Sequence, residues 1–267
     1  MATHPDAWVY GDFAPDPTSR DLVGLKARWI VDHLPPGLAP AVLDYGAGEG
    51  KHLHLVRKVR PQAHLVGVDI RQAHGEVDFE FHRVAAHEPL PFAADTFDAV
   101  VSCDVLEHVD NIERSLDEIR RVLRPGGAFI GFVPAEGGPG PHAFFRMLDA
   151  NIYRDTKDHN HAYRRSELVR WFASRFRIVK LEHSYHFLGA TMDAVFFASF
   201  KAPGIGSKME HFWRGQENPF YRGSAAAKPS LVGRFARIAN TTAYWESRLL
   251  RNVAFASKGL HFHVEKP

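Results

Sequence analysis

The chain has 267 residues, 45% of them hydrophobic and 24% charged, which is the composition of a globular protein and excludes a fibre or a disordered segment. Its 33 Lys and Arg nearly balance its 31 Asp and Glu, so the net charge of +2 does not indicate wholesale nucleic-acid binding. The charge is uneven, however: residues 201–267 carry eleven basic and four acidic side chains, net +7, which leaves the first 200 residues at −5. We therefore expect any anionic partner to meet the C-terminal third, where a solvated basic surface is the simpler interpretation and contact with a membrane or an anionic substrate is the alternative.

The single cysteine, Cys103, excludes an internal disulfide and a multi-cysteine metal centre, and it is typical of a reducing compartment. No apolar run approaches the roughly 20 residues that cross a bilayer. Residues 1–18 hold three prolines and three aspartates and lack the pattern of a secretory signal. These features predict a cytoplasmic protein.

Short apolar runs alternate with helical patterns along the first half of the chain. A lead-in helix is expected within Thr18–Leu34, ended by Pro35-Pro36-Gly37. The predicted strands that follow are Ala41–Tyr45, His64–Asp69, Phe79–Val84, Phe97–Cys103 and Ala128–Val133, and the predicted helices among them are Lys51–Val59 and Asp110–Leu123. Asp110 is the expected cap of the second helix. Strands interleaved with helices predict an α/β fold with a doubly wound, mostly parallel sheet.

The second half of the chain is less regular. The pattern predicts a helix at Ser166–Phe176, a strand at Arg177–Tyr185, a possible strand at Val195–Phe200, helices at Leu231–Ala239 and Tyr244–Asn252, and a closing strand at Leu260–Glu265. Four segments follow from this pattern. They are a lead-in segment and helix that could serve as a lid (1–40), a core (41–186), a mainly helical, aromatic and basic insertion (187–255) and the closing strand (256–267).

Three glycines follow the first predicted strand at alternate positions, Gly46, Gly48 and Gly50, directly after Asp44. Glycine permits a positive φ and lets a ligand approach the start of the next helix. A dinucleotide fingerprint places its third glycine three residues after the second, where this chain has Lys51. Asp44 would repel a pyrophosphate and attract an amino group, so the loop favours a nucleoside with a positive centre.

Five motifs stand in order between residues 40 and 133. They are Val42–Gly50, Gly67–Ile70, Leu90–Phe92 with Phe97-Asp98, Val105–Asp110 and Leu123–Gly127. This series resembles the small-molecule branch of the class I S-adenosylmethionine-dependent methyltransferases. The resemblance implies a seven-stranded sheet whose last strand is antiparallel, S-adenosylmethionine as the cofactor, and methyl transfer as the activity.

The resemblance also assigns residues to the sugar and methionine parts of the cofactor. Asp69, at the end of the second predicted strand, would accept hydrogen bonds from both ribose hydroxyls, because one carboxylate can serve two donors. Asp44, Gly46 and Gly48 would surround the methionine moiety.

The adenine contacts follow the family pattern less closely. Ile70 would lie against the adenine face, and members of the family commonly place an aspartate four residues before the "LPF" motif, where this chain has Ala86. His87, Glu88 or a backbone carbonyl would then bind the adenine amine. Cys103, at the end of the fourth predicted strand, completes the candidate cofactor residues, although a buried small apolar side chain is the simpler interpretation of this cysteine.

Methyl transfer requires mainly that donor and acceptor be aligned in a dry pocket, but an oxygen or nitrogen acceptor can also need a base. His161 and His108 are the first candidates, since imidazole titrates near neutral pH, and Tyr153 is a further catalytic candidate. The alternative for Glu107-His108 is a carboxylate at a helix start and a histidine that only packs. Histidine pairs at 52/54, 159/161 and 261/263 have a spacing that metal ligands can use, but seventeen histidines make chance pairs common and no metal is expected.

The acceptor is expected to enter over residues 134–165 and 187–255, which are rich in aromatic side chains and arginine. This composition favours a small or amphipathic, lipid-like acceptor methylated on oxygen, unless the aromatics form a core of their own. N- or C-methylation, a cofactor-binding homologue without turnover and, at lower weight, an NAD-dependent oxidoreductase are the alternatives. A nucleic-acid substrate is not expected, because no base-flipping motif follows the fourth predicted strand, and the oligomeric state is open.

Overall fold

A computed structural model describes residues 14–71, 77–85, 88–136, 139–148, 163–200, 204 and 231–267. Within this part of the chain, seven strands form one twisted sheet in the order β3-β2-β1-β4-β5-β8-β7. The strands are β1 Ala41–Tyr45, β2 His64–Asp69, β3 Glu80–Arg83, β4 Phe97–Cys103, β5 Leu123–Glu136, β7 Arg177–Ser184 and β8 Gly259–Glu265. A two-residue strand, β6 Tyr163–Arg164, pairs with the end of β5 away from this path.

The sheet is parallel except for its last strand. β8 runs antiparallel to both of its neighbours, β5 and β7, whereas β1 to β5 pair in parallel. The predicted closing strand therefore lies between two strands that precede it in sequence. The expected doubly wound, mostly parallel α/β fold is confirmed.

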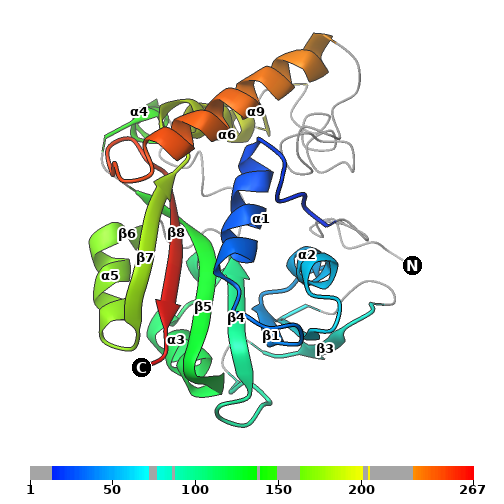
Figure 1. The fold of residues 1–267 in the computed structure, drawn as a ribbon. Coiled ribbons are helices and arrows are strands. Elements are labelled where there is room, and N and C mark those ends of the chain that lie inside the picture. Colours follow the sequence, from blue (N-terminus) through cyan, green and yellow to red (C-terminus); the bar gives the residue numbers. More distant parts are fainter. Residues whose placement is uncertain are drawn as a thin grey trace.

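Helices cover both faces of the sheet (Figure 1). They are α1 Leu22–His33, α2 Lys51–Val59, α3 Ile112–Val122, α4 Pro141–Leu148, α5 Arg165–Ala173, α6 Phe187–Phe200 and α9 Leu231–Leu249, with a short 3-10 turn, η1, at Leu106–His108. α1 and α2 pack on one face and α3 and α5 on the other.

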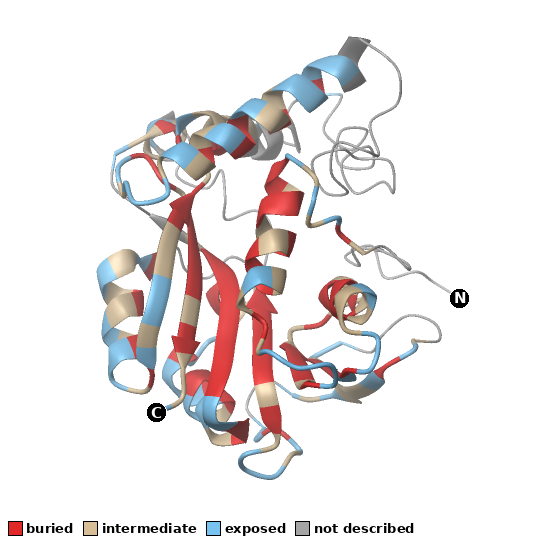
Figure 2. Ribbon diagram, viewed as in Figure 1, coloured by how far each residue is buried: buried red, intermediate tan, exposed pale blue. Residues whose placement is uncertain are grey.

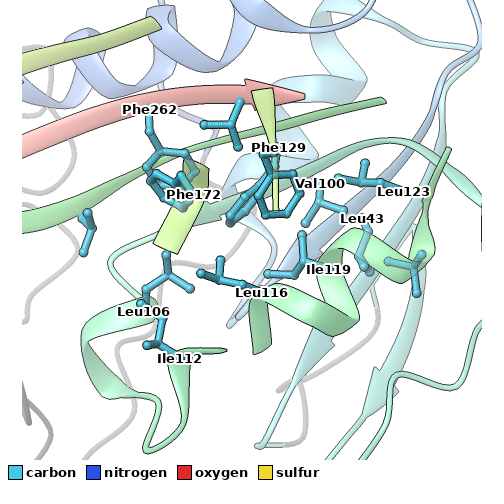
Figure 3. Packing of buried hydrophobic residues seen from close by; sticks show 14 of the residues in the cluster. Leu43, Val100, Leu106, Ile112, Leu116, Ile119, Leu123, Phe129, Phe172 and Phe262 are labelled. Carbon is cyan, nitrogen blue, oxygen red and sulfur yellow. The ribbon is translucent and has the colours of Figure 1, made fainter. Parts of the chain in front are cut away.

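Side chains from alternate strand positions form a core on each face. Leu43, Val100 and Phe129 point to the α3 and α5 side, where they meet Leu116 and Phe172 (Figure 3). The residues next to them in β1, β4 and β5 point to the α1 and α2 side. Because both faces are covered, these strands are mostly apolar, as parallel strands usually are.

Three predicted details are wrong. The cap of α3 is Asn111 and not Asp110: the Asn111 side chain accepts a hydrogen bond from the Arg114 N–H at 3.0 Å. Val195–Phe200 belongs to helix α6 and not to a strand, because an apolar run without turn residues has no period to distinguish the two. The two helices expected after residue 230 form the single helix α9, since residues 240–243 contain neither glycine nor proline to interrupt it.

Helices α4, α6 and α9 gather at the end of the molecule where the parallel strands finish (Figure 1). α9 packs on α6 and α1, and the Glu246 carboxylate accepts hydrogen bonds from the Leu188 N–H and the Gly189 N–H at the start of α6. This carboxylate compensates for the unpaired N–H groups of that helix start. Among the described helices, none has both the length and the apolar character that crossing a bilayer requires.

Histidines buried in the last strands make the stability sensitive to acid. Burial first, and then the nearby charge of Lys26, lowers the pKa of His261 to about 3, and burial likewise lowers the pKa of His183 and His263 to about 4. Neither ring nitrogen of His261 has a hydrogen-bond partner among the described residues, and the ring lies against Trp29 and Phe132. This histidine is therefore folded in its neutral form.

Replacing His261 with phenylalanine should reduce this acid sensitivity. Between the lowered pKa and the unfolded value of about 6.5, the unfolded chain binds a proton that the folded chain does not, so each such histidine lowers the free energy of unfolding by up to about 1.4 kcal/mol per pH unit as the pH falls. Urea unfolding of His261→Phe from pH 7 to pH 4 should therefore show a shallower decline than the wild type. Parallel curves would show that His261 does not titrate in this way.

Candidate functional site

The loop between β1 and α2 turns on three glycines with positive φ: 83° at Gly46, 53° at Gly48 and 78° at Gly50. A Cβ atom at Gly46 would lie 2.3 Å from the Val105 side chain, and one at Gly50 would lie 2.3 Å from the Phe79 ring. A Cβ atom at Gly48 would meet no atom within 4 Å. Two of the glycines thus allow close packing, whereas Gly48 faces open space from which a ligand can reach the backbone.

The carboxylate of Asp69 is held beside this loop. One oxygen, Oδ2, accepts a hydrogen bond from the Gly48 N–H at 2.9 Å, and Oδ1 accepts one from the Arg71 N–H at 2.9 Å. The side chain is 8% exposed. Because an ionised carboxylate has about four acceptor positions, two such bonds orient Asp69 and leave it able to accept from a ligand's hydroxyl groups.

A second carboxylate, Asp44, is fully buried near the carboxyl end of β1. Neither of its oxygens has a hydrogen-bond partner within the described residues, and the His52 ring lies close by, with Nδ1 3.5 Å from Oδ2. Burying an unpaired carboxylate is costly, so a positive group nearby would stabilise it. An amino group on a ligand fits this requirement.

The expected adenine residues occupy different environments. Ile70 follows Asp69 just beyond the carboxyl end of β2 and is 59% exposed, so its side chain is accessible to a flat apolar group. Glu88 is exposed and its Oε2 accepts a hydrogen bond from the Ala85 N–H at 3.3 Å. Cys103 is buried, and burial raises the pKa of its thiol to about 12, so it is a neutral packing group. His87 lies outside the described residues.

An ion pair at the end of β4 was not expected from the sequence. Lys26 of α1 donates to both carboxylate oxygens of Asp104, at 2.9 Å and 2.6 Å, and its ammonium lies 3.8 Å from the centre of the Phe132 ring. Burial alone would raise the pKa of Asp104, but the charges of Lys26 and Lys51 outweigh it and lower the pKa to about 2. Asp104 therefore stays ionised at the strand end.

The next turn carries a buried acid, Glu107, in η1. Neither carboxylate oxygen has a hydrogen-bond partner among the described residues. Burial, and then the charge of Asp104, raises the pKa of Glu107 well above its usual range, so the protonated form is favoured. The adjacent His108 side chain is 33% exposed, with its Nε2 4.0 Å from Glu107 Oε1.

The catalytic candidates are only partly placed. The structure brings His108 to the carboxyl end of β4, beside Glu107 and near Tyr163, whose hydroxyl donates to the Leu106 carbonyl at 2.9 Å. His161 and Tyr153 lie outside the described residues. The sequence had suggested neither Lys26 nor Asp104, and the one available signal was the position of Asp104 immediately after a predicted strand. In the described part of the chain, no three His, Cys, Asp or Glu side chains gather as metal ligands would.

Comparison with known families decides what kind of domain holds these groups. Residues 43–131 match the family model described as a methyltransferase domain, and this range contains Asp44, the glycine loop, Asp69 and the Glu107-His108 turn. This match identifies residues 43–131 as a methyltransferase domain.

Relatives of this methyltransferase domain are known from sequence and from structure. Demethylmenaquinone methyltransferase of Symbiobacterium thermophilum is 36% identical over 37% of this chain, and the match spans only 43% of that relative. Ubiquinone biosynthesis O-methyltransferase of Aeromonas salmonicida is 24% identical over 73% of this chain and 89% of its own length. The crystal structure of the cyclase SpnF has the same fold, with a TM-score of 0.54 and 18% identity over 90% of this chain and 79% of that one.

The glycines of the methyltransferase loop should respond differently to substitution by alanine. Gly48→Ala has free space and should cost only the strain of a left-handed residue, about 1–2 kcal/mol in the free energy of unfolding. Gly46→Ala adds a collision with Val105 and should lose roughly 1–3 kcal/mol more. Denaturant unfolding of both variants tests this difference. Equal losses would contradict the assignment of Gly48 to an open, ligand-facing position.

Proposed function

We propose that this chain is an enzyme that transfers a methyl group from S-adenosylmethionine to a small amphipathic acceptor, most simply onto oxygen. The observation that carries the proposal is the carboxylate of Asp69, fixed 2.9 Å from the Gly48 N–H beside a glycine with open space in front of it. A nucleoside is bound in such folds by an acid at the end of the second strand and by a glycine backbone after the first strand that the ligand can approach closely.

The residues present fit S-adenosylmethionine. Asp69 would accept from the two ribose hydroxyls, and Ile70 would contact the adenine face. The unpaired carboxylate of Asp44 suits an amino group, and this pairing would offset its burial. When bound, the cofactor supplies a methyl group on a sulfonium centre, which is a good leaving group.

The protein's own contribution is positioning and proton handling. The loop glycines and Asp69 orient the cofactor, and the turn after β4 supplies side chains that face the acceptor. His108 is partly exposed and can accept a proton from an acceptor hydroxyl, while the raised pKa of the buried Glu107 disfavours a negative charge beside it. The Lys26–Asp104 ion pair fixes α1 to the strand end close to this turn.

Two observations support an amphipathic acceptor. Both relatives named above act in quinone biosynthesis or on demethylmenaquinone by their names, and a quinone precursor has a polar ring on an apolar tail. The helices at the carboxyl ends of the strands also present exposed apolar side chains, among them Phe144 and Met147 of α4. The rival candidate is a different reaction on the same fold, since SpnF is a cyclase.

A transfer assay with labelled S-adenosylmethionine separates these candidates. We expect methylation of a hydroxyl on a prenylated catechol, and weaker turnover of catechol without the tail. His108→Gln should lower kcat by about 100-fold, the usual contribution of a general base, while leaving the KM for the cofactor unchanged. Product analysis that places the methyl group on carbon would refute O-methylation. Cofactor binding without transfer to any hydroxylated acceptor would favour the rival candidate.

A further inference from the structure

One helix of the methyltransferase exposes an apolar stripe along its outer side. Four residues of α9 form it, with exposed fractions of 73%, 67%, 52% and 83%: Phe235, Ile238, Trp245 and Leu249. At 100° and 1.5 Å per residue, these four residues lie on one side of the helix and extend about 21 Å along its axis. The residues of α9 that are buried lie on the opposite side of the helix: Ala236, Asn240, Ala243, Tyr244 and Ser247. Figure 2 shows α9 at the end of the molecule with much of its surface exposed.

The charge beside this stripe has one sign. Arg234, Arg237 and Arg248 all fall on the same flank, between the stripe and the buried side. The single carboxylate of α9, Glu246, falls on the other flank and accepts hydrogen bonds from the start of α6. The Arg20 guanidinium adds a further positive charge, 5.7 Å from the centre of the Trp245 ring. The outer side of α9 is therefore apolar and basic.

A bilayer with anionic headgroups matches this combination. A helix that lies in the interface places an apolar side among the acyl chains and arginines among the phosphates. A second copy of this chain matches it less well, since arginines from two copies would meet at the contact and α9 offers no free carboxylate to pair with them. The net charge of +7 over residues 201–267 favours the same anionic partner.

We propose that the outer side of α9 docks this methyltransferase on anionic membrane surfaces. α9 lies at the end where the parallel strands finish, so docking places the acceptor side of the sheet close to the bilayer (Figure 1). An acceptor with an apolar tail could then pass between lipid and enzyme without crossing water. The inference does not depend on the proposed function, because docking needs neither cofactor nor acceptor.

Cosedimentation of the full chain with vesicles tests this inference. The protein should bind phosphatidylcholine vesicles that contain phosphatidylglycerol, bind pure phosphatidylcholine weakly, and dissociate as salt is raised. Phe235→Ser combined with Leu249→Ser should lower the partition constant at least about tenfold. Arg234→Gln and Arg248→Gln should each lower binding to the anionic vesicles by roughly fivefold.

Matched controls lie away from α9. Leu38 is 75% exposed in the loop before β1, and Lys58 is exposed near the end of α2, so Leu38→Ser and Lys58→Gln should leave vesicle binding unchanged. Failure of the wild type to bind anionic vesicles would overturn the proposal, as would equal binding by the double serine variant. A dimer in solution that the serine substitutions dissociate would also overturn it, since the stripe would then join two copies of the chain.

Discussion

The hydrogen bond from the Gly48 N–H to the Asp69 carboxylate is the contact on which the site depends. It joins the loop after β1 to the end of β2, and the Gly46 and Ala47 N–H groups both donate to the Val68 carbonyl at 2.9 Å in the same place. The register of the two strands makes this possible, because Tyr45 pairs with Val68 and Asp69 then stands one residue beyond. Because adjacent parallel strands end on the same side of the sheet, Asp69 and the Gly48 backbone come together there through local pairing alone.

The other side of the site is assembled from elements that are far apart in sequence. Lys26 and Asp104 are separated by 78 residues, yet their ion pair attaches the first helix to the end of the fourth strand. The pKa of Glu107 rises first because the group is buried, and then because the charge of Asp104 disfavours a second negative charge beside it. Asp104 thus favours the ionised form and Glu107 the protonated form, with the partly exposed His108 next to them. This contrast arises because burial dominates at Glu107, whereas the nearby lysines outweigh burial at Asp104.

The sequence predicted most where local and global signals agree. β1, α2, β2 and β4 begin and end where the apolar pattern places them, because buried parallel strands and the glycine turn leave little freedom. The family resemblance assigns Asp69 and Gly48 to one cofactor, and in the structure they lie within 2.9 Å of each other. The prediction was wrong where no local signal exists: Val195–Phe200 is a short, largely apolar run without a clear period, and it belongs to helix α6. The Lys26–Asp104 pair could not be predicted either, since nothing in the sequence says which helix residue faces a given strand end.

Titration calorimetry with S-adenosylhomocysteine tests the central claim, that Asp69 and the glycine loop hold a nucleoside of this kind. The wild type should bind it, and Asp69→Ala should weaken binding by about 1.5–3 kcal/mol, the usual value of hydrogen bonds to a charged group. Asp78 is an exposed carboxylate just before β3, at the end of the sheet where the parallel strands begin. Asp78→Asn therefore serves as the control and should bind as the wild type does. Heat on addition of NAD but none with S-adenosylhomocysteine would contradict the account.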